Sequence, residues 1–230
     1  RQMCIRDRWD DLLDEMSIDD LQQTIGFGGY QTAAVDSIGK VRTNDCDGPA
    51  SINNNFTGVG SVGFPAATLI GMTWSKDLAH DFGDSIGKMA NEMNTSGWYG
   101  PAMNIHRTAF AGRNFEYYSE DPFVAGTICA AEVQGIQSKG VYVYLKHVAL
   151  NDSETSRRGV NTWLNEQTAR EIYLEVADKA ITDGGAWSVM TGFNRWGATW
   201  CGANANLLTG FLRGELGMRG MCITDFSGSS

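Results

Sequence analysis

Hydrophobic and polar positions near the start of the chain follow a helical period. From Trp9 the pattern WDDLLDEMSIDDLQQTIG places four apolar side chains on one helical face, Leu12, Leu13, Met16 and Leu21. Ser17 and Asp20 form a capping-box-like pair inside this pattern, which predicts two short helices rather than one. The next segments predict a loop in TNDCDGPAS and a buried strand in the apolar run FPAATLIGM.

The remainder of the chain alternates between helical and strand patterns. Ser75 is a predicted N-cap for a helix with apolar residues at helical spacing, Leu78, Phe82, Ile86, Met89 and Met93. GWYGPAMNIH predicts a short strand, and Asp121 with Pro122 begins a helix that ends near Gly140. The segments that follow are predicted to alternate in the order strand VYVYLKHV, helix 165–184, strand WSVMTGF, helix 204–217 and strand MCITDF.

This alternation with short linkers predicts an α/β fold with parallel strands. Continuous apolar strands fit either a closed (β/α) barrel or an open doubly wound sheet. We favour a (β/α)8-type TIM barrel because polar residues stand at the end of nearly every strand, where barrel enzymes place their active site: Asn104 to His106, Lys146 and His147, Asn194, and Asp225. In an open sheet, only the switch point would carry such residues.

The two ends of the chain differ from its middle. The opening RQMCIRDR has no helical or strand period and carries four charges, so we interpret residues 1–8 as a non-native leader. The chain stops at DFSGSS, directly after a strand pattern, where a folded domain would normally continue into another element. Residues 9–230 are therefore predicted to be a partial barrel domain, incomplete at its C-terminal end.

Composition excludes several classes of partner. The net charge is −9 and no basic stripe exists to neutralise a phosphate backbone, which argues against nucleic acid. No apolar run approaches the roughly 20 residues of a membrane helix, and the glycine-rich nucleotide motifs are absent. The five cysteines form no CxxC pair or cysteine–histidine cluster, so we expect free thiols, no metal site and a reducing compartment such as the cytoplasm, although no targeting signal assigns a location.

Three polar segments carry the candidate chemistry. In GRNFEYYSEDP, residues 119–122 start a helix, whereas Arg113 is available to donate forked hydrogen bonds. In KHVALNDSETSRR, Lys146 follows an apolar strand and is costly to bury without a carboxylate or polar ligand; His147 and Arg157 accompany it. Asp225 in TDF could cap a helix or act in catalysis. In a barrel these residues, together with Asp47, would surround one mouth.

Five strings in order, DGPAS, GRNFEYYSEDP, KHVALNDSETSRR, VMTGFN and ITDF, resemble the signature segments of glycoside hydrolase family 3 β-glycosidases. Together they span the chain from Asp47 to Asp225. The resemblance implies a barrel domain and a retaining, exo-acting β-glycosidase of β-glucosidase type. Such an enzyme hydrolyses O-glycosyl bonds at the non-reducing end through a covalent glycosyl-Asp intermediate, and it uses no metal or organic cofactor.

The resemblance also assigns roles to individual residues. Asp225 matches the catalytic nucleophile. Asp47 matches the carboxylate that binds hydroxyl groups of the glycone through hydrogen bonds. The other substrate-binding positions implied are Arg113, Lys146, His147, Arg157, Met190 and Phe193. Nearby cations would keep a nucleophilic carboxylate ionised. Two positions depart from the family pattern: Phe193 stands where many relatives have Tyr, and Phe226 where Trp commonly follows the nucleophile.

The second carboxyl group that retention requires, about 5–5.5 Å from the first, is the acid/base. The branch acting on N-acetylglucosaminides carries a second His after Lys-His, but here the loop reads ALNDSETSRR, which favours the glucosidase branch. In that branch a separate domain supplies the acid/base. The candidates within the chain, which the pattern makes structural or sugar-binding, are Glu116, Glu120, Asp121, Asp152 and Glu154.

The expected partners are therefore a β-linked oligosaccharide or an aryl or alkyl β-glycoside, together with a second domain that carries the acid/base. Three alternatives remain open at this point: an inactive sugar-binding barrel, a β-xylosidase, and a β-N-acetylglucosaminidase of the same family. The sequence does not distinguish glycone, linkage or aglycone.

Overall fold

The computed structural model describes residues 8–226, which divide into two compact units, one up to Asp45 and one from Cys46. Residues 1–7 of the predicted leader lie outside the described residues, and the boundary at residue 8 stays a prediction. Within the described residues, no helix is long and apolar enough to cross a membrane.

The first unit begins with the two short helices that the sequence predicts, α1 (Trp9–Asp14) and α2 (Ile18–Gly26). Ser17 caps α2 through a complete capping box, because its hydroxyl accepts from the Asp20 amide while the Asp20 carboxylate accepts from the Ser17 amide at 3.0 Å. A short 3₁₀ turn and two paired strands complete the unit: η2 (Asp36–Ile38), β1 (Gln31–Thr32) and the first part of β2 (Thr43–Asp47).

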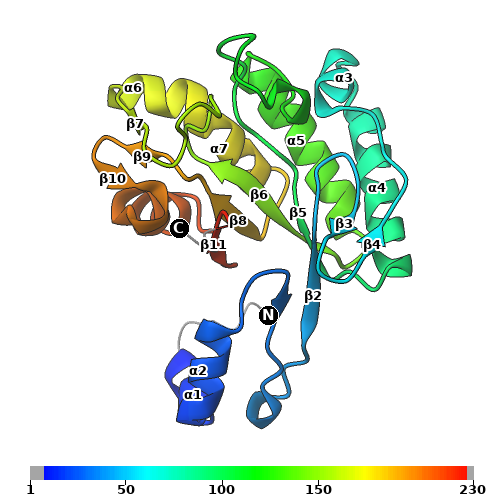
Figure 1. Cartoon of the computed structure of the whole chain (residues 1–230), viewed down its shortest axis with the longest axis vertical. Helices are drawn as coiled ribbons and strands as arrows, with labels where there is room; N and C mark the ends of the chain where they lie inside the picture. The colour runs from blue at the N-terminus through cyan, green and yellow to red at the C-terminus, as the bar shows by residue number, and fades with distance from the viewer. Residues whose placement is uncertain (1–7, 227–230) are drawn as a thin grey trace. The chain divides into compact units, whose positions relative to one another are not determined.

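The second unit is built on a sheet with the strand order β11-β8-β6-β5-β2-β3-β4 (Figure 1). Its strands are β3 (Asn53–Asn54), β4 (Val59–Gly60), β5 (Gly97–Tyr99), β6 (Tyr142–Val148), β8 (Ser188–Thr191) and β11 (Cys222–Thr224). The neighbours β5 and β6, β6 and β8, and β8 and β11 are parallel. Six of the seven residues of β6 are buried, which agrees with its continuous apolar pattern.

Helices connect these strands and pack on one another. They are α3 (Ala67–Met72), α4 (Lys76–Glu92), α5 (Pro122–Gln137), α6 (Glu166–Thr168), α7 (Glu175–Thr182), the π-helices η4 (Ala169–Leu174) and η6 (Asn206–Glu215), and the 3₁₀ turns η3 (Asn114–Glu116) and η5 (Cys201–Ala203). Helix α5 lies between α4 and α7 (Figure 1). The prediction of an α/β fold is confirmed, and the alternation is that of an incomplete (β/α) barrel.

Two predicted helix starts are confirmed in atomic detail. The Ser75 hydroxyl accepts from the Leu78 amide at 3.2 Å at the start of α4, and Asp121 Oδ1 accepts from the Val124 amide at 2.9 Å at the start of α5. Helices α4 and α5 approach closely at Gly83 and Gly135. A Cβ at either glycine would overlap the backbone oxygen of the other helix, so this contact excludes larger residues.

Two sequence predictions are wrong. TNDCD forms strand β2 instead of a loop, because its polar side chains find partners within the fold rather than water; Asp45 is buried, for example. FPAATLIGM contains helix α3 instead of a strand. In α3, Ala67, Ile70 and Gly71 are buried while the intervening side chains are more exposed, and six residues are too few for this period to stand out from a continuous apolar run.

A second, three-stranded sheet was not predicted. It has the order β10-β9-β7, formed by β7 (Asn161–Thr162), β9 (Arg195–Trp196) and β10 (Thr199–Trp200). Strands of two residues contain too few positions to display alternation. Cys46, Cys129, Cys201 and Cys222 carry free thiols, whereas Cys4 lies outside the described residues.

The core of the second unit contains an ionisable group, Glu132 of α5, which is 1% exposed. The Tyr118 hydroxyl donates to Glu132 Oε2 at 2.5 Å. Burial raises the pKa of this carboxyl from 4.5 to about 8, although the Tyr118 hydrogen bond opposes the shift. Glu132 is therefore neutral at pH 7, and the folded protein loses this proton only in alkaline solution.

Glu132→Gln is expected to flatten the pH dependence of stability. The folded state raises the pKa of the Glu132 carboxyl. Proton binding by this group therefore contributes its full stabilisation to the folded protein below about pH 4.5, and that contribution is lost as the pH rises to about 8. The loss approaches at most ~1.4 kcal/mol per pH unit. Urea unfolding of the variant between these pH values should show a smaller slope than the parent. The exposed Glu120→Gln serves as the control, and parallel slopes for Glu132→Gln and parent would contradict the assignment.

Candidate active site

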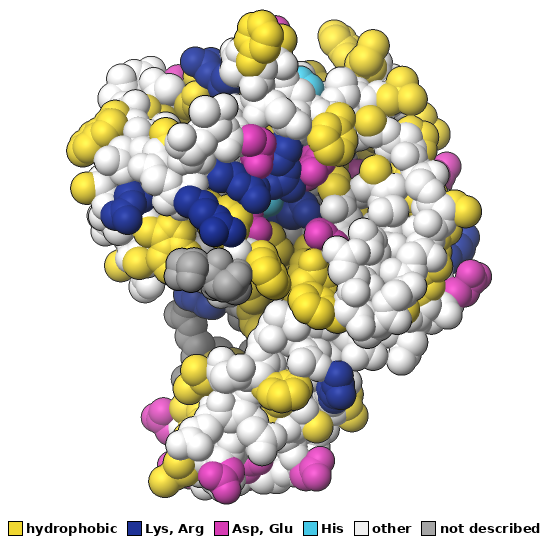
Figure 2. Space-filling model, in the orientation of Figure 1, with side chains coloured by type: hydrophobic (Ala, Val, Ile, Leu, Met, Phe, Trp, Pro, Cys, Tyr) yellow, Lys and Arg dark blue, Asp and Glu magenta, His cyan; other side chains and the backbone are white. Residues whose placement is uncertain are grey.

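The predicted site residues all lie on one side of the second unit, at or after the carboxyl ends of strands. Asp47 ends β2, Lys146 and His147 stand near the end of β6, Met190 lies in β8, and Asp225 directly follows β11. Arg113, Arg157 and Phe193 come from the loops after β5, β6 and β8. Figure 2 shows basic and acidic side chains with a histidine gathered in a hollow of this unit.

Lys146 is buried and is neutralised by Asp47. Its side chain is 3% exposed, and Nζ donates to Asp47 Oδ1 at 2.9 Å and to the Gly48 carbonyl at 3.2 Å. The Asp47 side chain is 40% exposed, so the ammonium group of this ion pair is buried and its carboxylate lies at the surface. Asp47 is thus the carboxylate partner expected for Lys146, because a lysine buried after an apolar strand is costly without one. A ligand hydroxyl can reach Asp47 from solvent.

Arg113 is fixed by a forked pair with Glu116. Its Nε donates to Oε1 at 3.0 Å and its Nη2 to Oε2 at 2.7 Å. Burial opposes the charge, but the hydrogen bonds and charge of Glu116 outweigh it and raise the pKa of the guanidinium. Arg113 Nη1 is then left to point to His147 Nε2, 3.2 Å away. Glu116, a candidate acid/base in the sequence, is thus engaged as a structural partner.

His147 is held by Asn104 and is neutral. Asn104 Oδ1 accepts from the His147 amide at 2.8 Å, and Asn104 Nδ2 donates to the His147 carbonyl at 3.0 Å. Burial, followed by the charges of Arg113, Lys146 and Arg157, holds the pKa of His147 well below its usual range. Because a guanidinium only donates, Nε2 accepts from Arg113, which places the imidazole proton on Nδ1, 3.5 Å from the Tyr117 hydroxyl.

Asp225 has one anchored and one unpartnered oxygen. Its backbone amide donates to the Thr191 carbonyl at 3.1 Å, and Oδ1 accepts from the Phe226 amide at 2.7 Å. Oδ2 is buried, has no hydrogen-bond partner among the described residues, and lies 3.5 Å from His147 Nε2 and 3.8 Å from Arg157 Nη1. With Nε2 unprotonated, His147 does not donate to this oxygen, which keeps its lone pairs available to a ligand.

Arg157 brings positive charge next to Asp225. Its Nη1 lies 2.9 Å from Glu154 Oε2, but without hydrogen-bond geometry, so the contact is an ion pair. Its guanidinium carbon is 4.6 Å from the centre of the Phe193 ring, and that of Arg158 is 5.2 Å from it. Phe193 therefore supports two cations through its ring face, which a phenyl ring does as well without a hydroxyl.

Three of the other acidic candidates, Asp121, Asp152 and Glu154, also have partners among the described residues. Asp121 caps α5, and Glu154 accepts from Asn151 Nδ2 at 3.1 Å in addition to pairing with Arg157. Burial raises the pKa of Asp152 to about 6, opposed by Arg107 and by a hydrogen bond with Tyr173. Asp121 is thus held at a helix end and Glu154 in a loop.

Comparison with known proteins assigns the chain to a family. The family model for the glycosyl hydrolase family 3 N terminal domain matches residues 51–229. The chain belongs to this family. Beta-glucosidase A of Butyrivibrio fibrisolvens is 37% identical over 209 residues, which cover 90% of this chain and 25% of that protein. A beta-glucosidase of Rhizobium radiobacter is 35% identical over 224 residues, covering 96% of this chain and 27% of the relative.

Solved beta-glucosidase structures share the fold. Beta-glucosidase 3B of Thermotoga neapolitana, solved in complex with glucose, superimposes with a TM-score of 0.85 at 30% identity, covering 94% of this chain and 33% of its own. A beta-glucosidase of Kluyveromyces marxianus, also in complex with glucose, gives a TM-score of 0.89 at 30% identity over 96% of this chain and 27% of its own. The chain thus spans about a quarter of the length of its curated relatives.

The structure adds residues to this candidate site to which the sequence alone gave no specific role. Asn104 clamps His147, Tyr117 and Asn151 support the same loop, and Phe56 contacts Phe226 with ring centroids 6.5 Å apart. Asn104 was noted only as a polar residue at a strand end; its position after buried Ala102 and Met103 was the available signal. For Phe56, on the turn between β3 and β4, the sequence offered no signal of a place near Asp225.

Proposed function

We propose that the protein to which this chain belongs is a retaining, exo-acting β-glycosidase of β-glucosidase type, with Asp225 as its nucleophile. The observation that carries the proposal is the buried, unpartnered Oδ2 of Asp225, 3.8 Å from the Arg157 guanidinium and 3.5 Å from a neutral imidazole. A carboxylate oxygen with an open lone pair in a cationic pocket can attack an electrophilic carbon and leave again.

In the first step, Asp225 Oδ2 forms a bond to the anomeric carbon while the bond from that carbon to the aglycone oxygen breaks. The leaving oxygen takes a proton from an acid/base that we place in a second domain. In the second step the same group removes a proton from water, the water oxygen attacks the anomeric carbon, and the ester bond to Asp225 breaks. The charge on Asp225 is restored, and Arg157 is placed to attract it throughout.

The remaining residues bind the glycone in this proposal. Asp47, which pairs with Lys146 on one side, accepts hydrogen bonds from sugar hydroxyls. Lys146, His147, Arg113 and Arg157 offer donors or an acceptor around the ring. Met190 and Phe193 complete the apolar part of the wall, consistent with their burial in and after β8. The reaction needs no metal or cofactor. The substrates are a β-linked oligosaccharide or an aryl or alkyl β-glycoside.

We also propose that residues 9–230 are a partial barrel domain preceded by a non-native leader at 1–8. The sharpest test of the function is a screen of the full-length protein against nitrophenyl β-glycosides of glucose, xylose, galactose and N-acetylglucosamine. The proposal expects release of nitrophenol with the glucoside foremost. A preference for the xyloside or the N-acetylglucosaminide would replace the glycone assignment, and turnover of none would favour an inactive sugar-binding barrel.

A further inference from the structure

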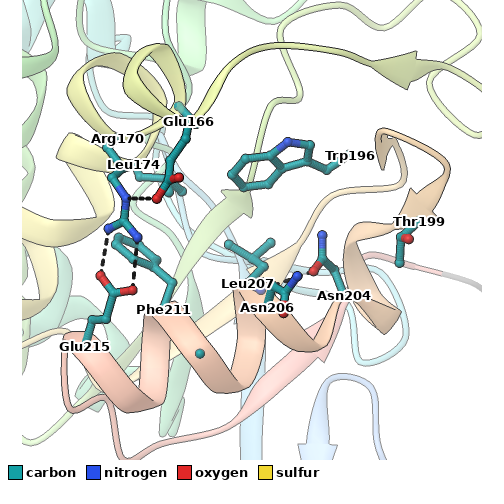
Figure 3. A pocket seen from close by; sticks show the side chains of 12 residues that line it. Glu166, Arg170, Leu174, Trp196, Thr199, Asn204, Asn206, Leu207, Phe211 and Glu215 are labelled. Carbon is teal, nitrogen blue, oxygen red and sulfur yellow. Dashed lines mark hydrogen bonds and ion pairs between the residues drawn. The ribbon is translucent and has the colours of Figure 1, made fainter.

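A cavity of about 580 Å³ lies between the π-helices η4 and η6, next to the three-stranded sheet (Figure 3). Leu207 and Phe211 of η6 are buried and form its apolar floor. Trp196 of β9 forms a wall, with its indole ring above Leu207. The eight residues of the candidate active site do not line it, so this cavity is a separate feature of the domain.

One end of the cavity carries a saturated ion-pair group. Arg170 Nε donates to Glu166 Oε1 at 2.9 Å, and its Nη1 and Nη2 donate to Glu215 at 2.7 and 3.0 Å. Two carboxylates surround one guanidinium, which leaves a net negative charge and no open face of the cation for an anion. The carboxylate oxygens have further lone pairs and can accept from hydroxyl groups.

The other end carries neutral amides. Asn204 and Asn206 line the cavity there, and Figure 3 shows them on the side away from the Arg170 group. Asn204 Oδ1 accepts from the Leu207 amide at 3.2 Å, which fixes the orientation of its side chain. Side-chain amides both donate and accept, as hydroxyl groups do. The cavity therefore combines an apolar floor and an aromatic wall with hydroxyl-compatible groups at both ends.

We propose that this cavity is a second saccharide-binding site, which takes one or two neutral pyranose units with a C–H face against Trp196. A pyranose has an apolar face and a polar rim; the face buries apolar area on an indole ring whose π surface is negative, and the rim hydroxyls meet amides and carboxylates. The volume lies within the range of small-molecule sites, about 300–1,000 Å³. The inference goes beyond the proposed hydrolysis and does not depend on Asp225.

Gly210 provides a way to close the cavity without disturbing the fold. It lines the cavity on η6, and beyond the adjoining helix backbone the nearest atom to an added Cβ would be the Ala205 carbonyl oxygen, 4.0 Å away. Gly210→Gln therefore places a side chain into the binding space and replaces a glycine that helices disfavour. Thr209→Gln is the matched control, because Thr209 is an exposed neighbour on the same helix that does not line the cavity.

The test is a titration of the fluorotryptophan-labelled full-length protein with cellobiose in its non-hydrolysable thio-linked form, followed by ¹⁹F NMR at Trp196, whose signal a Trp196→Phe spectrum assigns. We expect a saturable shift with a millimolar Kd in the parent and in Thr209→Gln, and at least about a tenfold weaker Kd in Gly210→Gln. Asp225→Asn should leave this titration unchanged, so that failure here is distinct from failure of the proposed catalysis.

Three outcomes would overturn the proposal. They are the absence of a saturable shift at Trp196, an unchanged Kd in Gly210→Gln, and a response to tetramethylammonium but not to cellobiose. The last would assign the cavity to organic cations attracted by Glu166 and Glu215. Loss of dispersed signals in Gly210→Gln would be checked with Asn206→Leu, whose exposed side chain lies at the cavity rim and whose substitution should weaken cellobiose binding in the same direction.

Discussion

The Asp225→Asn variant of the full-length protein is expected to lose roughly a thousandfold or more in kcat while it still binds substrate. Asparagine keeps the size of the side chain and can keep the Oδ1 bond to the Phe226 amide, but it removes the charged oxygen that would form the glycosyl ester. Steady-state kinetics with an aryl β-glucoside measure the loss, and inhibition by glucose measures the binding that remains.

Asp47→Asn is the control for this experiment. It lies at the same mouth and removes the same charge, yet its proposed role is to hold glycone hydroxyls beside Lys146. The expected effect is weaker glycone binding and slower turnover with the covalent step intact. A kcat for Asp225→Asn within about tenfold of the parent would contradict the assignment of the nucleophile, since loss of a covalent nucleophile has larger effects.

The 230-residue chain alone is expected to hydrolyse cellobiose about 10²–10⁴-fold more slowly than the full-length protein, because the leaving sugar has no dedicated acid. Three of the five candidate carboxylates inside the chain are already engaged: Glu116 is held by Arg113, Asp121 caps α5, and Glu154 pairs with Arg157. Parallel assays of the two proteins at equal concentration measure the ratio.

A dinitrophenyl β-glucoside with added azide provides the matched control for the isolated chain. This leaving group departs with little protonation, and azide attacks the ester without a general base, so glucosyl azide should form if Asp225 and the glycone site are intact. Near-full cellobiose activity in the isolated chain would instead place the acid/base within residues 1–230, with Glu120 or Asp152 as the first positions to substitute.

Much of the fold could be predicted from the sequence because its signals are local. The capping contacts of Ser17, Ser75 and Asp121 are short-range chemistry, and the apolar run of β6 implies burial on both faces. Of the two wrong elements, α3 is too short to show its period, whereas strand β2 fails because its partners are distant in sequence. Strand β2 is polar, and its residues are satisfied by groups distant in sequence, such as Lys146 for Asp47, which no local pattern contains.

In the candidate site, too, the sequence predicts the features that follow a local pattern and not the long-range contacts. Strand-end residues such as Lys146, His147 and Asp225 could be placed from the barrel pattern, because parallel strands bring their carboxyl ends together. The bonds that set their chemistry could not: the Asn104 clamp on His147 joins residues 43 apart in sequence, and the proton position on His147 depends on Arg113. Such long-range pairs become visible only in three dimensions.

The most direct test of the account is covalent trapping of the full-length protein with a 2-deoxy-2-fluoro-β-glucoside that carries a good leaving group. Fluorine slows formation and hydrolysis of the ester, and the leaving group lets the ester accumulate. Peptide mapping by mass spectrometry is predicted to find the sugar on Asp225, and labelling should persist in Asp47→Asn and vanish in Asp225→Asn. A trapped sugar on Asp47, Glu116 or any carboxylate other than Asp225 would contradict the central assignment.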